Sequence, residues 1–78
     1  MIPADRIEIN PNVMLGKPVI RGTRIPVEFI LRKLSEGATE AELLDGYPRL
    51  TSEDIRAALA YAADTVGHEE TLALASAD

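Results

Sequence analysis

The sequence predicts a mainly α-helical protein, with a tri-helical helix-turn-helix core over residues 26–67 and a short β-hairpin arm over residues 1–25. Apolar residues recur at helical spacing in the runs 26–36 and 52–66, and a short capped segment lies between them. Before residue 26, β-branched residues instead alternate with Asn, Gly and Pro, which favour turns. A long, a short and a second long helix joined by tight loops is the order of a helix-turn-helix unit.

The arm contains three extended runs. Residues 6–9 alternate apolar and charged side chains and are followed by the turn sequence Asn-Pro-Asn. The runs 18–20 and 23–25 are rich in β-branched residues and flank Arg21-Gly22, where a glycine can take a positive φ. We therefore expect 18–20 and 23–25 to pair as a hairpin.

The first helix is expected to begin at Pro26, because the N–H that proline lacks would have no partner at the first helical position. Gly37 ends it as the residue after the cap. Its inner stripe follows the spacing i, i+3, i+4, i+7 and consists of Val27, Ile30, Leu31 and Leu34.

The second helix is predicted to be short. Thr39 and Glu42 have the spacing of a capping box, and the helix runs out at Gly46, before Pro48. Leu43 and its neighbour Leu44 supply its apolar side chains.

The third helix is capped by Thr51 or Ser52, with carboxylates in its first turn where the helix dipole favours negative charge. Its predicted inner stripe is Ile55, Ala58, Leu59, Ala62 and Val66. Gly67 is expected to break it, which leaves residues 68–78 as a short tail that frays.

Composition restricts the classes of function. A chain of 78 residues without cysteine forms one small domain with no disulfide, and its one histidine, His68, does not make a metal site alone. Because no serine or threonine has an evident base partner, we expect a protein that is not an enzyme, with no catalytic, cofactor or metal site. No apolar run of about 20 residues and no signal peptide is visible, which predicts a cytoplasmic protein without a membrane span.

Charge is segregated along the chain. The net charge is −5, yet the stretch 9–27 holds no acidic residue and three cations, Lys17, Arg21 and Arg24. A cationic arm on an anionic body indicates an interaction surface. These cations are candidates for phosphate or for an acidic protein partner, whereas the apolar residues between them pack on the helices or pair with a second copy. A homodimer is expected, because isolated hairpins are marginal in water.

The third helix is the candidate DNA-reading element, since the start of the second helix of such a motif faces the major groove. The alternative is a solvated capping turn, because Glu53 and Asp54 repel phosphates. The candidate contacts at this helix start are Arg49, Thr51, Ser52 and Arg56.

Five motifs occur in order along nearly the whole chain: IEINPN (7–12), GKPVIRGTRIPV (16–27), GATEAELL (37–44), YPRLTSEDI (47–55) and AALAYAA (57–63). With them the sequence resembles domain-of-unknown-function family number 433. The resemblance implies a small prokaryotic protein with a homeodomain-like fold, and some members are VapB-type antitoxins encoded beside a PIN-like ribonuclease toxin.

The resulting hypothesis is an antitoxin that also acts as the DNA-binding autorepressor of a type II toxin–antitoxin pair, with a PIN-like ribonuclease toxin and a double-stranded operator as partners. The alternative is a protein–protein adaptor that keeps the helix-turn-helix fold without binding DNA. VapB-type antitoxins usually carry a flexible toxin-binding tail, whereas this chain has only HEETLALASAD after Gly67. Toxin binding would then use the domain itself or this short tail.

Overall fold

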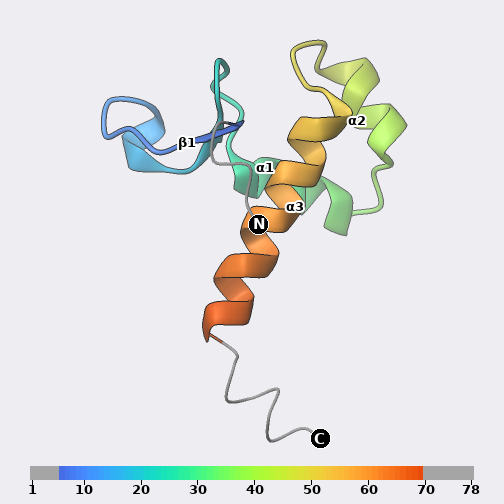
Figure 1. Ribbon diagram of the computed structural model, residues 1–78. Helices are drawn as coiled ribbons and strands as arrows, with labels where there is room; N and C mark the ends of the chain where they lie inside the picture. The colour runs from blue at the N-terminus through green and yellow to red at the C-terminus, as the bar shows by residue number, and fades with distance from the viewer. Residues whose placement is uncertain (1–5, 70–78) are drawn as a thin grey trace, which may run out of the picture.

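The computed structural model describes residues 6–69, with side chains as far as residue 67, and it confirms a mainly α-helical chain with a short antiparallel hairpin (Figure 1). The predicted tail 68–78 lies outside the described residues, apart from the backbone of residues 68 and 69 at the end of the third helix. In chain order the elements are strand β1 (Ile7–Glu8), the 3₁₀ turn η2 (Met14–Gly16), strand β2 (Val19–Ile20), and helices α1 (Val27–Ser35), α2 (Glu40–Gly46) and α3 (Ser52–Glu69).

The hairpin is made by different strands from those expected. β1 pairs with β2 in antiparallel register, with Ile7 opposite Ile20. The run 23–25 forms no strand, and the return segment makes one isolated bridge, Pro26 to Val19. No longer ladder forms, because Pro26 has no N–H to donate and Val27, whose N–H still bonds to Pro18 O, already begins α1. The prediction of an 18–20/23–25 hairpin is thus correct in part: the chain bends at Gly22, with φ +82°, and returns beside β2 with a bond from Ile20 N to Ile25 O, but the strand partner of β2 is β1.

β2 is part of the core and does not stand free of the helices. Val19 and Ile20 are both buried, and the partly buried Ile25 packs against the core from the return segment. Hydrogen bonds from Ile20 N to Ile25 O (2.9 Å) and from Val27 N to Pro18 O (2.9 Å) attach the turn to the start of α1. The cluster that holds β1, β2 and the helices together consists of Ile7, Ile20, Val27, Ile30, Leu43, Leu50, Ile55, Ala57 and Ala58.

Helices α1 and α2 begin and end within a residue of where their local signals predict. Gly37 has φ +103°, and its N–H and that of Ala38 donate to the carbonyls of Leu34 (3.1 Å) and Lys33 (3.0 Å), which satisfies the last turn of α1. Pro26 is the residue before α1 rather than its first residue. At α2, the capping box joins Thr39 and Glu42 in both directions, and the helix stops at Gly46.

The inner stripe of α3 is only half buried. Ile55 and Ala58 lie in the core, whereas Leu59 is 46% and Val66 51% exposed. Gly67 does not break the helix, which continues to Glu69, because one interior glycine costs only about 1 kcal/mol. Figure 1 shows the second half of α3 (orange) running past the ends of the other helices. Two expectations, a fully inner stripe and a break at Gly67, are thus corrected.

The loop between the strands contains an unusual backbone. Met14 and Leu15 both have positive φ, 51° and 57°, and Gly16 follows with φ +85°. The Leu15 side chain is 95% exposed, so packing does not compensate for this conformation. The loop is closed by backbone bonds from Gly16 N to Val13 O (3.0 Å) and from Lys17 N to Met14 O (3.1 Å).

Candidate nucleic-acid and partner interface

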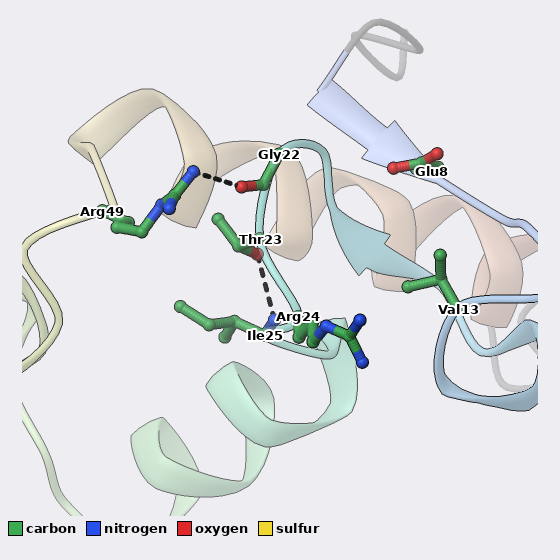
Figure 2. Close-up of a pocket in the computed structure, with 7 residues that line it drawn as sticks. All are labelled: Glu8, Val13, Gly22, Thr23, Arg24, Ile25 and Arg49. Atoms are coloured by element: carbon green, nitrogen blue, oxygen red, sulfur yellow. Dashed lines mark hydrogen bonds between the residues drawn. The ribbon is translucent and has the colours of Figure 1, made fainter.

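The turn after β2 and the turn between α2 and α3 are tied together by one arginine. Arg49 Nη2 donates to the carbonyl of Gly22 at 2.5 Å, across 27 residues of sequence (Figure 2). The β2 turn is itself held in shape by Thr23, whose hydroxyl donates to Ile20 O (2.7 Å) and accepts from Ile25 N (3.0 Å). Tertiary structure therefore places a rigid, cationic turn next to the start of α3.

An open hollow of about 530 Å³ has both residues of this contact in its lining. Figure 2 shows Arg49 reaching Gly22 from the α2–α3 side, whereas Arg24 extends on the side of Val13. Both arginines are exposed, and Glu8 of β1 is the one acidic residue among the lining side chains. The lining residues are Glu8, Val13, Gly22, Thr23, Arg24, Ile25 and Arg49.

The other cations of the arm lie in different surroundings. Lys17 pairs with Glu28 of α1 (3.0 Å), and both side chains are more than half exposed. Arg21 directs Nη2 toward the carbonyl of Ile7 at 3.4 Å, beside β1. Of the three cations that the sequence grouped together, Arg24 is therefore the one that lines the hollow with Arg49.

At the start of α3, two of the predicted contact residues are engaged within the chain. Thr51 is the helix cap, with Asp54 N donating to its hydroxyl at 3.1 Å, and the Ser52 hydroxyl donates to Glu40 of α2. Arg56 is exposed on the next turn. Because Glu40 accepts the bond from Ser52 and the exposed Glu53 follows Ser52 in the first turn of α3, the helix start itself carries carboxylates that repel an anion.

Sequence reasoning missed the role of Arg6 and Asp54. Asp54 is the one buried charged residue in the described part of the chain, and its Oδ1 accepts from Arg6 Nη1 at 3.0 Å. Its Oδ2 accepts from Thr51 N at 3.1 Å, so one carboxylate both caps α3 and anchors the start of β1. The sequence predicted a cap at Thr51 or Ser52 with carboxylates in the first turn, but no local signal indicates a partner 48 residues away.

Within residues 6–67, no three His, Cys, Asp or Glu side chains gather as metal ligands would. Over the same residues, no helix combines the length and apolarity that a membrane span needs. The side chain of His68 lies outside the described part of the structure.

A family model described as a protein of unknown function, DUF433, matches residues 7–62, which include both strands and most of α3. The chain belongs to the DUF433 family. The matched region contains every residue that lines the hollow. The resemblance drawn from the sequence motifs is thereby confirmed.

A crystal structure of a DUF433 member from Anabaena variabilis is similar, with a TM-score of 0.74 and 38% identity, covering 91% of this chain and 69% of that one. An uncharacterized protein of Sinorhizobium fredii, y4eO, is 38% identical over 53 residues, which are 68% of this chain and 24% of that protein. An uncharacterized protein of Archaeoglobus fulgidus is 54% identical over 28 residues, 36% of this chain and 78% of that protein. The chain thus spans about a quarter of the length of y4eO.

Proposed function

We propose that this DUF433 protein is an antitoxin that also binds double-stranded DNA upstream of its own gene, as the autorepressor of a type II toxin–antitoxin pair with a PIN-like ribonuclease toxin. The order α1, α2, α3 with a tight α2–α3 turn supports the interpretation of these helices as a helix-turn-helix unit. The observation that carries the DNA half is the Arg49–Gly22 bond, because it brings Arg24 and Arg49 to one surface beside the start of α3. The antitoxin half rests on family resemblance.

The surface that Arg24 and Arg49 share suits contact with phosphate groups. Guanidinium groups bind phosphate oxygens in a bidentate geometry and fix the position of a protein on the duplex. Arg56, exposed on the first turns of α3, is then the candidate for a base contact, which is worth about 1 to 3 kcal/mol of discrimination. Because the chain carries a net charge of −5, we expect DNA contact to be confined to this surface and to depend strongly on salt.

The DNA half is tested by fluorescence anisotropy with a duplex from upstream of the gene, at two salt concentrations. Arg24→Ala removes an exposed lining residue and should weaken binding and reduce the dependence on salt. Arg32→Ala is the matched control, because the Arg32 side chain is 68% exposed on α1 outside the hollow. Absence of binding to the upstream duplex, or equal affinity of the two variants, would leave the adaptor as the surviving candidate.

The antitoxin half is tested by co-expression of the full chain with the neighbouring open reading frame. Co-purification of a nuclease-like partner, together with suppression of its ribonuclease activity, is the expected result. A neighbouring product that neither binds the chain nor cleaves RNA would contradict this half. The DNA-binding measurement stands independently of that outcome.

The proposed role requires no catalytic group in this chain. Binding to DNA and to a toxin uses surface charge and apolar contact, for which a small domain without a cofactor is sufficient. We therefore propose that any ribonuclease activity of the pair belongs to the partner.

A further inference from the structure

The tip of the turn after β2, residues 22–24, stands clear of the core. Gly22 and Arg24 are exposed, and apart from the adjoining residues no atom lies within 4 Å of the place that a Cβ on Gly22 would occupy. The base of the turn is held by the bond from Ile20 N to Ile25 O (2.9 Å) and by the hydroxyl of Thr23. These bonds join residues of one segment, so they shape the turn without orienting its tip relative to the helices.

A single hydrogen bond joins this tip to the helical part of the chain. Within the residues whose side chains are described, the tip makes no hydrogen bond with a helix or with the α2–α3 turn (residues 47–51) besides the one from Arg49 Nη2 to Gly22 O. Because a peptide unit is planar, fixing the Gly22 carbonyl restricts the backbone that leads to Arg24. Arg49 therefore acts on the direction in which the Arg24 side chain leaves the turn.

The α2–α3 turn that carries Arg49 is itself well anchored. Leu50, the next residue, is 4% exposed in the core, and its N–H donates to Tyr47 O at 2.8 Å. The ring of Tyr47 packs edge-on against Phe29 of α1, with 5.4 Å between the centroids. The guanidinium is thus held from the helical side, so it restrains the tip of the β2 turn and does not follow it.

The two arginines of the hollow differ in what they can still bind. Arg49 Nη2 is directed at the Gly22 carbonyl, whereas Arg24 extends on the side of Val13 (Figure 2). In the part of the chain that the structure describes, the Arg24 guanidinium has no hydrogen-bond or ion-pair partner. Arg24 is therefore available to a phosphate oxygen with all of its donors, while Arg49 already has an acceptor within the chain.

We propose that Arg49 is a positioning residue for the contact between Arg24 and DNA, an inference that rests on the proposed function. By bonding the Gly22 carbonyl, Arg49 holds the tip in one orientation relative to α3, so that Arg24 meets a phosphate while Arg56 reaches the bases. A side chain that is already oriented loses less conformational freedom on binding. Replacing Arg49 should then remove the contribution of Arg24, although Arg24 itself is unchanged.

The first test measures the order of the tip in the full chain without DNA. In Arg49→Ala, ¹⁵N relaxation should show the backbone order parameters of residues 22–24 falling from the rigid value of about 0.85 toward the flexible range below about 0.6, with Leu50 unchanged. Arg32→Ala is the matched control, because it removes an exposed arginine of α1 outside the hollow. Equal order parameters at residues 22–24 in the two variants would overturn the positioning role.

The second test is a double-mutant cycle in binding to the upstream duplex, measured by fluorescence anisotropy over a range of salt concentrations. One phosphate contact contributes about 0.9 to the slope of log K against log salt. Arg24→Ala and Arg49→Ala should each lower this slope by about 0.9, and the double variant should lower it no further. An additive loss of about 1.8, or a slope that Arg49→Ala leaves unchanged, refutes positioning through Arg24.

The two tests separate the positioning role from the proposed function. If the wild-type chain binds the duplex and the losses are additive, the proposed function stands and the positioning role fails. If the wild-type chain binds no duplex, the proposed function fails together with the DNA part of this inference, whereas restraint of the tip by Arg49 is still decided by the order parameters.

Discussion

Replacing Asp54 by alanine should be among the most destabilising single polar substitutions in this chain. The side chain is 6% exposed and accepts two hydrogen bonds, from Arg6 Nη1 at 3.0 Å and from Thr51 N at 3.1 Å. A hydrogen bond between charged groups contributes about 1.5–3 kcal/mol, and loss of a helix-cap contact costs about 1 kcal/mol. Because Arg6 keeps a side chain that is 38% exposed and is rehydrated in part, we expect a loss of about 3 kcal/mol.

The assay is urea unfolding followed by circular dichroism, with Glu53→Ala as the matched control. Glu53 is the exposed carboxylate next to Asp54 in the same first turn, so its loss should cost less than about 1 kcal/mol. A small domain near 5 kcal/mol in total would lose most of its stability in Asp54→Ala, with a fall in Tm of about 15 °C. The double variant with Arg6→Ala measures the coupling between the two residues. Equal stability of Asp54→Ala and Glu53→Ala, or a coupling near zero, would refute the anchoring role.

Three further substitutions test the fold. Gly37→Ala should destabilise the chain by about 1 kcal/mol, because φ is +103° there and a Cβ is strained in that region, whereas Gly46→Ala, in α2, should not. Leu15→Gly should stabilise by about 0.5–1 kcal/mol, since Leu15 is 95% exposed with φ 57°; a fall in the urea midpoint would contradict this. Ile30→Ala, fully buried, should cost about 2–5 kcal/mol in the same assay, and a loss below 1 kcal/mol would place Ile30 outside the core.

Helix boundaries followed from signals within a few residues of one another. The Thr39–Glu42 capping box and the left-handed Gly37 involve hydrogen bonds between residues at most five positions apart, so local spacing is enough to predict them. The expectation that Gly67 ends the third helix was wrong, because a lone glycine lowers helix propensity by a small amount that the rest of an 18-residue helix outweighs.

The candidate site could be predicted only as a set of residue types. Lys17, Arg21 and Arg24 are close in sequence, but in the folded chain Lys17 pairs with Glu28, whereas Arg24 shares a hollow with Arg49. The predicted helix-start contacts Thr51 and Ser52 became a cap and a link to α2, since a hydroxyl near a helix start serves either purpose equally well.

The sequence by itself determined the helical class, the family, the ends of α1 and α2 and the segregation of charge, because these depend on neighbouring residues. Tertiary structure alone decided that β2 pairs with β1, that Asp54 anchors Arg6 across 48 residues, and that Arg49 joins Gly22 across 27. It also decided that Leu59 and Val66 stay exposed, although their spacing equals that of buried residues. The reason is that periodicity marks which face of a helix is apolar, while burial depends on where the neighbouring elements end.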